Sequence, residues 1–540
     1  MKKIFTIIIS IIAGNMVVAQ SIQGLAFEDA ISDGQNRENS ALIYFKYTKY
    51  SDRDADTLKV ELWDHYFGKL AKTHGYTFKN IPLRKGSMLE GLFPSSDQVI
   101  TVQIADLHKP SYISLSLSSN NTMEKFLIFP GDSIKIYSQP FRNILTFSGP
   151  SAPLFECQRA LRNQRLADAF LRPAKYIHPN QASRNTFLDK KDNSAKYDQA
   201  KLNFGEVLDL SVVDNTYLER LKSNTQTVPT GGVYRILEFY RDQISQEAFD
   251  LLLADEIGFL YNRLIKDWSS AYSFKKIEGD TEFLQKLKAF YYEEIHPLNF
   301  GFDIETIKNS TYFKDFLISK SKAESNIKDQ PIFKTLGQYP DDIRDFLIGK
   351  YLFNNFGQLS NGTEILNDVL TYVREPYIRQ KLEELYSKKG SGQAVKDFEF
   401  KDIDGNLVRL SDFKGKTVLL DFWFTGCKAC INFYETYLSQ VENHFEETDG
   451  FVLVSISTDK DPSKWKNSVA GGRYSSPTGV NLYTNGEGFN HSFLIDYNIT
   501  GAPYQLLIDK DGRMIQSGGL QVSHEKLIPL LEAQIGSINQ

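Results

Sequence analysis

The sequence predicts a multidomain protein that joins an N-terminal antiparallel β domain, a central α-helical domain and a C-terminal α/β domain. Three observations support this prediction. The chain has 540 residues, which at about 150 residues per domain corresponds to three or four domains. The spacing of apolar residues changes from short strand-like runs to helical intervals near residue 150. After residue 390, strand-like and helical segments alternate, as they do in α/β domains.

The composition is that of an ordinary globular protein. Apolar residues make up 41% and charged residues 24% of the chain, which excludes a disordered, a collagen-like or a multispan membrane protein. The net charge of −5 argues against nucleic acid as a partner, because nucleic-acid-binding domains are usually basic. The cysteines Cys157, Cys427 and Cys430 are too few for a disulfide framework and leave one thiol unpaired.

Residues 1–19 predict a secretory signal peptide. A basic start precedes the mostly apolar residues 4–13, and small residues precede a cleavage point between Ala19 and Gln20. The alternative is an uncleaved anchor, although Gly14 interrupts the run before the ~20 apolar residues that a membrane span needs. We therefore expect a periplasmic or cell-envelope protein with no integral membrane span after signal cleavage, in an oxidising compartment.

Residues 20–150 predict the β domain, which we expect to be a sandwich or barrel-like module. Several of its short β-branched or aromatic runs alternate apolar and polar side chains, the pattern of an antiparallel sheet with one buried face. The runs are residues 41–47, 99–104, 112–117 and 125–129. Turn signals such as Pro130-Gly131 separate several of them.

Residues 151–390 predict the helical domain. Apolar residues recur at i, i+3 and i+4 intervals from Gln246 to Trp268, and residues 341–352 and 365–386 show similar spacing. Aromatic residues recur without a fixed period, so a solenoid is not indicated. Residues 388–393 break the helical pattern with glycine and serine and predict a linker.

Residues 391–540 predict the α/β domain. Residues 417–423 and 451–457 are almost continuously apolar, which suits parallel strands that are buried on both faces. Residues 504–509 followed by Asp511-Gly512 predict a strand and a hairpin turn. The expected order is strand, helix, strand, helix, strand, strand, helix, in a mixed sheet.

The pair Cys427 and Cys430 stands directly after a buried strand and opens a helix. A thiol at a helix N-terminus faces unpaired N–H groups and the positive end of the helix dipole, which favour the reactive thiolate. Lys428 adds a nearby positive charge. The position predicts that Cys427 attacks a disulfide and that Cys430, one turn later, resolves the mixed disulfide.

Two further residues are candidates for the same site. Asp421 lies in an apolar strand, where burial would raise its pKa and let it exchange a proton with Cys430, directly or through water. The alternative is a partly exposed aspartate at the strand end. Pro503 opens a strand, where proline is tolerated because it need not donate a ladder hydrogen bond. The functional alternative is a cis Ala502–Pro503 bond that presents the Ala502 backbone to a peptide substrate.

These motifs, in this order, resemble the thioredoxin fold, and most closely the TlpA-like extracytoplasmic thiol–disulfide oxidoreductases. The matching segments are residues 410–423, the Cys427/Cys430 pair, residues 455–459 with Trp465, and residues 501–503 with residues 507–512. The resemblance implies that Cys427 is the attacking cysteine and Cys430 the resolving one. It also implies that Asp421 is the buried acid and Pro503 the cis proline. We assign the substrate-binding surface to Trp423, Gly426, Ala502 and Pro503.

A shorter resemblance covers residues 126–134 and 146–149, which are similar to the N-terminal region before TlpA-like domains in Bacteroidetes-type envelope proteins.

The sequence departs from the family pattern in two places at the dithiol. Gly426 stands where the family commonly has Trp, and Lys-Ala separates the cysteines where Gly-Pro or Pro-Pro is common. Redox potential and partner choice therefore do not carry over.

Other interpretations explain the cysteine pair less well. A zinc site needs four ligands, and the nearby histidines are isolated. In peroxiredoxins a Thr stands three residues before the reactive Cys, whereas Thr425 is two before Cys427. A structural disulfide with so short a ring would contribute little entropy. A non-enzyme alternative stays open, in which the chain is chiefly a binding module for an envelope protein or a glycan.

We therefore expect an exported thiol–disulfide oxidoreductase that acts on protein thiols and disulfides, and the resemblance favours a protein-disulfide reductase. The dithiol carries two electrons, so no prosthetic cofactor and no metal is expected. A membrane reductant or another thioredoxin-like donor would recycle it. We expect Cys157 to be a buried apolar side chain, with a relay to Cys427 as the alternative.

Overall fold

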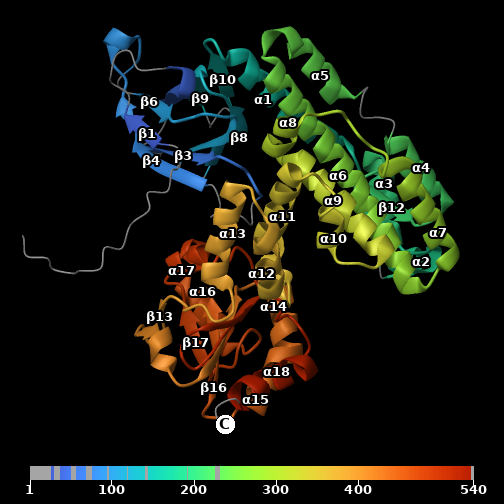
Figure 1. Ribbon diagram of the computed structural model, residues 1–540, viewed down its shortest axis with the longest axis vertical. Helices are drawn as coiled ribbons and strands as arrows, with labels where there is room; N and C mark the ends of the chain where they lie inside the picture. Colours follow the sequence, from blue (N-terminus) through green and yellow to red (C-terminus); the bar gives the residue numbers. More distant parts are fainter. Residues whose placement is uncertain are drawn as a thin grey trace, which may run out of the picture.

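The computed structural model describes residues 26–29, 37–49, 56–68, 76–93, 96–117, 120–139, 144–190, 192–225 and 231–536. They form a β part (residues 26–148), a helical part (residues 152–389) and an α/β part (residues 390–536), which follow one another from blue to red in Figure 1. The predicted signal peptide and its cleavage point lie outside the described residues. Within those residues, no helix is both long and apolar enough to cross a membrane.

The β part consists of two sheets. The first has the order β1-β6-β2-β9-β10, with β5 beside β6, and the second has the order β4-β3-β7-β8. Their strands are β1 (Ala26–Asp29), β2 (Ala41–Thr48), β3 (Thr57–Trp63), β4 (Tyr76–Pro82), β5 (Arg84–Lys85), β6 (Asp97–Ala105), β7 (Ser111–Leu117), β8 (Asn120–Ile128), β9 (Ser133–Gln139) and β10 (Ile144–Ser148). Phe45 of the first sheet and Val60 of the second share one core, so the two sheets form a sandwich.

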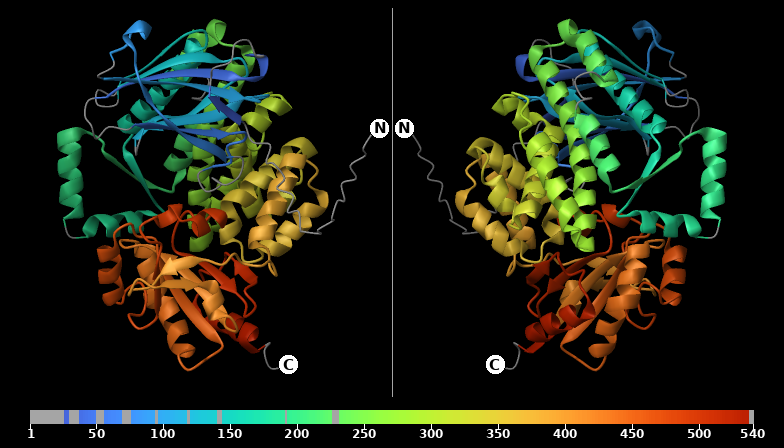
Figure 2. Two further views of the ribbon diagram at one scale, coloured as in Figure 1. Left: turned by 90° about the vertical axis from the view of Figure 1, so that its left-hand side faces the viewer. Right: turned by 90° about the vertical axis from the view of Figure 1, so that its right-hand side faces the viewer.

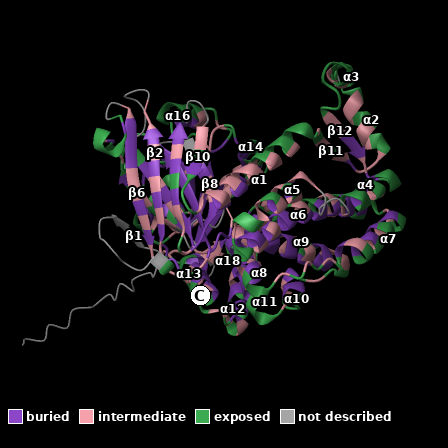
Figure 3. Ribbon diagram, turned by 90° about the horizontal axis from the view of Figure 1, so that it is seen from above, coloured by how far each residue is buried: buried purple, intermediate pink, exposed green. Residues whose placement is uncertain are grey.

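Side chains along β2 alternate between buried and half-buried, as the banding of this strand in Figure 3 shows. One pairing differs from the antiparallel expectation, because β2 and β9 run parallel. The chain reaches β9 from the β7–β8 hairpin of the other sheet, so no tight turn forces β9 to run against its neighbour.

The helical part contains thirteen α-helices among the described residues. They are α1 (Ala152–Leu171), α2 (Gln181–Asp189), α3 (Asn193–Phe204), α4 (Asn215–Thr225), α5 (Gly232–Tyr240), α6 (Gln246–Glu278), α7 (Thr281–Phe290), α8 (Ile304–Asn309), α9 (Thr311–Lys328), α10 (Ile332–Leu336), α11 (Asp341–Asn355), α12 (Gly362–Tyr372) and α13 (Pro376–Lys389). Helix α6 extends ten residues beyond the predicted end at Trp268.

Two features of the helical part differ from the sequence prediction. Residues 365–386 are not one helical stretch, because Pro376 starts a new helix and Glu375 before it is extended. The short strands β11 (Ala174–His178) and β12 (Leu208–Val212) pair in parallel within this part, although the helical spacing predicted no sheet there.

Helix α6 packs so closely against the first turn of α9 that the contact requires glycine. A Cβ on Gly258 would lie 2.3 Å from the backbone nitrogen of Phe313 and from the carbonyl carbon of Tyr312. We expect Gly258→Ala to lower the free energy of unfolding of the helical part by about 3 kcal/mol, because overpacking outweighs the ~1 kcal/mol by which alanine favours a helix. Urea unfolding followed by circular dichroism measures this change.

The exposed Ser270 in the same helix offers a matched control, and Ser270→Ala should stay within about 0.5 kcal/mol of wild type. An unchanged urea midpoint for Gly258→Ala would mean that the two helices do not approach each other this closely.

The β part and the helical part meet at the buried carboxylate of Asp255 in α6. Tyr112 Oη of β7 donates a hydrogen bond to it at 2.8 Å, Ser310 Oγ donates at 2.5 Å, and the backbone N–H of Tyr312 donates at 3.1 Å. Thr311 Oγ1 also donates to the Tyr66 carbonyl at 2.6 Å. The bonds of Tyr112 with Asp255 and of Thr311 with the Tyr66 carbonyl join the two parts, so separation would leave buried polar groups without these partners.

The α/β part has one mixed sheet with the order β14-β13-β17-β16-β15-β18-β19. Strand β16 runs parallel to both β15 and β17, whereas β18 runs antiparallel to β15 and β19. The elements are β13 (Glu399–Lys401), β14 (Leu407–Arg409), β15 (Thr417–Trp423), α14 (Lys428–Phe433), α15 (Ser439–His444), β16 (Phe451–Ser457), α16 (Pro462–Ala470), β17 (Val480–Tyr483), α17 (Ser492–Asp496), β18 (Tyr504–Ile508), β19 (Met514–Ser517) and α18 (His524–Gly536). The predicted strands and the β18–β19 hairpin are present, and β13, β14 and β17 are additional.

The predicted linker at residues 388–393 is not a free spacer. Helix α13 continues to Lys389, and the residues after it bond to the β19 hairpin. The backbone N–H of Gly392 donates to the Met514 carbonyl at 2.8 Å, and Arg513 Nη1 donates to the Gly392 carbonyl at 3.0 Å. The helical and α/β parts are therefore joined by hydrogen bonds at their connection.

Candidate active site

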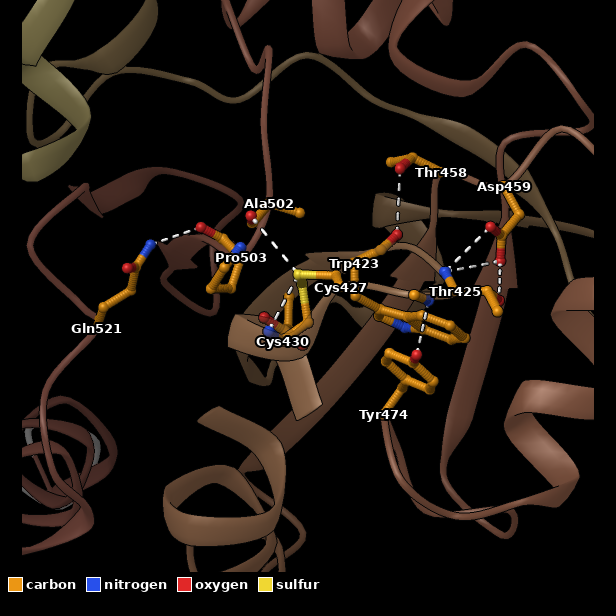
Figure 4. Close-up of a disulfide and its surroundings, with 12 residues drawn as sticks. Trp423, Thr425, Cys427, Cys430, Thr458, Asp459, Tyr474, Ala502, Pro503 and Gln521 are labelled. Carbon is orange, nitrogen blue, oxygen red and sulfur yellow. Dashed lines mark hydrogen bonds between the residues drawn. A yellow bond between two sulfur atoms is a disulfide. The ribbon is translucent and has the colours of Figure 1, made fainter. Parts of the chain in front are cut away.

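A disulfide between Cys427 and Cys430 lies at the N-terminus of α14, directly after β15 (Figure 4). Cys427 is the N-cap of the helix, and the backbone N–H of Cys430 points at its Sγ from 3.1 Å. The chain turns here because the buried strand β15 ends at Trp423, and the helix begins five residues later. The predicted position of the pair, at a helix start after a buried strand, is confirmed.

The loop before Cys427 is held by two residues that are distant in sequence. Asp459 accepts hydrogen bonds from the Thr425 backbone N–H at 3.0 Å and from Thr425 Oγ1 at 2.7 Å. Tyr474 Oη accepts the backbone N–H of Gly426 at 2.7 Å. Gly426 has φ = 96°, a conformation that costs a bulky residue energy, so this loop accounts for the absence of the Trp that the resemblance suggested.

Trp423 lies beneath the disulfide and not on the substrate-binding surface expected for it. Its side chain is fully buried in a cluster with Cys427 and Cys430. Its ring stacks on Tyr474 at 4.7 Å between centroids, and its Nε1 donates to Ser455 Oγ at 2.8 Å. Trp423 therefore packs against the dithiol in the protein interior, where a protein substrate would not contact its side chain.

Asp421 is buried in β15, so the alternative of a partly exposed strand-end carboxylate does not hold. Burial raises the pKa of this carboxyl to about 7, although a hydrogen bond from Gln505 Nε2 at 2.7 Å favours its charged form. Residues two apart in a strand share one face. Leu419, two residues before it, shares a core with Tyr434, and Trp423, two after it, clusters with the cysteines. Asp421 therefore faces the helix that carries Cys430.

The segment before β18 lies beside the disulfide. The Ala502–Pro503 peptide bond is cis, the isomer that the resemblance implied. The carbonyl oxygen of Ala502 is 3.8 Å from Cys427 Sγ, and Gln521 Nε2 donates to the Pro503 carbonyl at 2.5 Å (Figure 4). Both residues are half-buried, so part of their surface is open to solvent near the sulfur atom of Cys427.

Sequence reasoning gave no role to five residues that hold this site. They are Ser455, Asp459, Tyr474, Gln505 and Gln521. Ser455 and Asp459 lie in a segment that the resemblance had singled out, but without a role. The other three carry no local signal, because their hydrogen-bonding partners lie 18 to 84 positions away in the sequence.

Cys157 lies outside this site. It is a free thiol in α1, fully buried in the core of the β part, and burial raises its pKa to about 12. These properties match the expected buried apolar side chain and not a thiol that exchanges with Cys427. Across the described residues, no group of three or more His, Cys, Asp or Glu side chains is placed to hold a metal ion.

Comparisons with known proteins match this part of the chain. The Redoxin family matches residues 390–529, a span that contains the dithiol, Asp421 and Pro503. Thiol-disulfide oxidoreductase ResA of Bacillus thuringiensis subsp. konkukian is 31% identical over 125 residues, which are 23% of this chain and 67% of ResA. Thioredoxin-like protein YneN of Bacillus subtilis is 26% identical over 151 residues, which are 27% of this chain and 84% of YneN.

A solved thioredoxin domain of a thiol-disulfide oxidoreductase from Bacteroides vulgatus is 28% identical, with a TM-score of 0.24, and covers 27% of this chain and 98% of that domain. The family assignment rests on the sequence match to ResA together with the disulfide at the start of α14. The chain belongs to the thiol–disulfide oxidoreductases of the thioredoxin superfamily and is an oxidoreductase.

Proposed function

We propose that the protein is an extracytoplasmic protein-disulfide reductase in which Cys427 attacks and Cys430 resolves. One observation carries this proposal: Cys427 Sγ lies at the helix N-terminus and 3.8 Å from the carbonyl oxygen of the half-buried Ala502. In the reduced enzyme, the N–H of Cys430 that points at this sulfur would stabilise a thiolate. The half-buried Ala502–Pro503 backbone would bind the substrate's main chain alongside.

The reaction transfers two electrons to the substrate disulfide. The Cys427 thiolate attacks one substrate sulfur, which forms a mixed disulfide and releases the other substrate sulfur as a thiolate that takes up a proton. Cys430 then loses its proton and attacks Cys427 Sγ, which releases the second substrate thiolate. The products are two substrate thiols and the Cys427–Cys430 disulfide. Asp421, which faces the helix carrying Cys430, would accept the Cys430 proton.

The remaining proposals concern the setting of this reaction. The N-terminal pattern supports export to the periplasm or cell envelope. A membrane reductant or another thioredoxin-like donor would reduce the disulfide again, and no prosthetic group is required for the two-electron exchange. We also propose that the β and helical parts correspond to the N-terminal region of Bacteroidetes-type envelope proteins.

Reduction of insulin by the full chain, with dithiothreitol as electron donor, tests the activity. Cys427→Ser should abolish turnover, whereas the control Cys157→Ser should leave it intact, because Cys157 lies in another core. Equal turnover in Cys427→Ser and wild type would instead favour a binding protein with a dispensable dithiol. The reduction potential tests the direction, since about −270 mV indicates a reductant and about −120 mV an oxidant.

A further inference from the structure

The helical part contacts the α/β part directly beside the candidate active site. Residues 356–360, which follow α11, lie against the turn at Gly518 and Gly519. The Gly519 N–H donates to the Gly357 carbonyl at 3.2 Å. A Cβ on Gly518 would lie 2.6 Å from the Gly357 backbone, and one on Gly519 would lie 2.5 Å from the Cα of Ser360. The two backbones therefore touch, and no side chain fits between them.

A second contact holds the residue that follows Pro503. Lys389, at the end of α13, is buried, and its Nζ donates to Tyr504 Oη at 3.0 Å. A Cβ on Gly357 would lie 2.5 Å from the Tyr504 ring, so residues from two helical segments enclose this side chain. Tyr504 Oη is also 3.2 Å from Ser517 Oγ, which links the two strand ends.

These contacts lead to the disulfide in two short steps. The turn that begins at Gly518 continues to Gln521, whose side chain donates to the Pro503 carbonyl, and the preceding Ala502 carbonyl is 3.8 Å from Cys427 Sγ. Both views in Figure 2 place the orange and red α/β part directly below the yellow and green helices. The helical part is in turn held on the β part by the hydrogen bonds from Tyr112 to Asp255 and from Thr311 to the Tyr66 carbonyl.

We propose that the helical part is a positioning element of the active site: Gly357 and Lys389 hold the segment of Ala502, Pro503 and Tyr504 in the arrangement that binds a polypeptide substrate. The inference rests on the proposed function and extends it, because it makes recognition of a protein disulfide depend on residues outside the α/β part. A small disulfide needs only the sulfur of Cys427, so its reduction should not depend on this contact.

Two full-length variants test the proposal against two substrates, insulin and the small aromatic disulfide 5,5′-dithiobis(2-nitrobenzoate). Lys389→Met removes one hydrogen bond to Tyr504 and should raise KM for insulin about fivefold, the effect of one lost hydrogen bond. Its kcat, its reduction potential and its rate with the small disulfide should stay within about twofold of wild type. Gly357→Ala displaces the Tyr504 ring and should raise KM for insulin further. The exposed neighbour provides the control Lys388→Met, which should behave as wild type.

The proposal is overturned if KM for insulin is unchanged in both variants. It is also overturned if reduction of the small disulfide slows as much as reduction of insulin, because a general loss of structure would have that effect. Thiol–disulfide exchange is measured in both the reducing and the oxidising direction. The test therefore works equally well if the enzyme acts as an oxidant and not as a reductant. Failure of the proposed function would show in wild type itself, as absent exchange with both substrates, whereas this inference is judged by the ratio of variant to wild type.

Discussion

Cys430→Ser is expected to turn the enzyme into a trap that accumulates a mixed disulfide between Cys427 and its substrate. Without the second thiol, nothing in the site attacks Cys427 Sγ, so steady-state turnover should fall on the order of a thousandfold or more. The thiolate at the helix start remains, because the backbone N–H at position 430 survives the substitution. Non-reducing gels and mass spectrometry of the captured species measure the effect.

The reciprocal variant distinguishes the roles of the two thiols. Cys427→Ser should form no mixed disulfide, because Cys430 is the more deeply buried of the pair and lacks the contact with Ala502. A stable mixed disulfide through Cys430 in that variant would reverse the assignment. Cys157→Ser is the control, since its thiol has a pKa of about 12 and is not ionised at neutral pH.

Asp421→Asn is expected to remove an ionisation near pH 7 from the pH profile of the resolving step. Burial raises the pKa of Asp421 to about 7, so the carboxylate that can accept the Cys430 proton prevails only above this pH. The wild-type rate should therefore rise through about pH 7, and the variant should be slower by about a hundredfold at about pH 8, the usual contribution of a general base. Single-turnover kinetics of mixed-disulfide resolution measure both.

Gln505→Leu provides the matched variant for this prediction. This substitution removes the hydrogen bond that favours the charged form of Asp421 and so raises the pKa of the carboxyl further. The inflection in the pH profile of the resolving step should therefore remain but move to higher pH. An unchanged profile in both variants would show that another group, or water alone, takes the proton.

The same carboxyl affects stability, and the sign follows from its raised pKa. Folded Asp421 keeps a proton up to about pH 7, whereas an unfolded aspartate loses it near about 4. The folded state therefore binds more protons between these values, and the free energy of unfolding falls as the pH rises from about 4 to about 7. The asparagine side chain cannot ionise, so the variant avoids this loss. The free energy of unfolding of Asp421→Asn, minus that of wild type, should therefore be larger at about pH 8 than at about pH 4.

Much of the architecture could be predicted because it depends on local patterns. The continuous apolar run of β15 and the helical spacing in α6 each reflect burial of neighbouring residues in the chain, and both elements are present. The predictions were wrong where strand pairing or a single residue determines the local structure. Strand β9 joins β2 in parallel, and Pro376 divides a helical stretch whose spacing alone looked continuous.

The sequence by itself indicated the chemistry that we propose for this protein. It shows two cysteines at a helix start, an aspartate in a buried strand and a proline at a strand start, and these signals are local or carried by motif order. Only the tertiary structure decided what surrounds them. Asp459 and Tyr474 hold the loop before Cys427, and the helical part lies against the segment of Pro503. Such contacts join residues far apart in the chain, and they arise from backbone packing and single hydrogen bonds that leave no periodic pattern in the sequence.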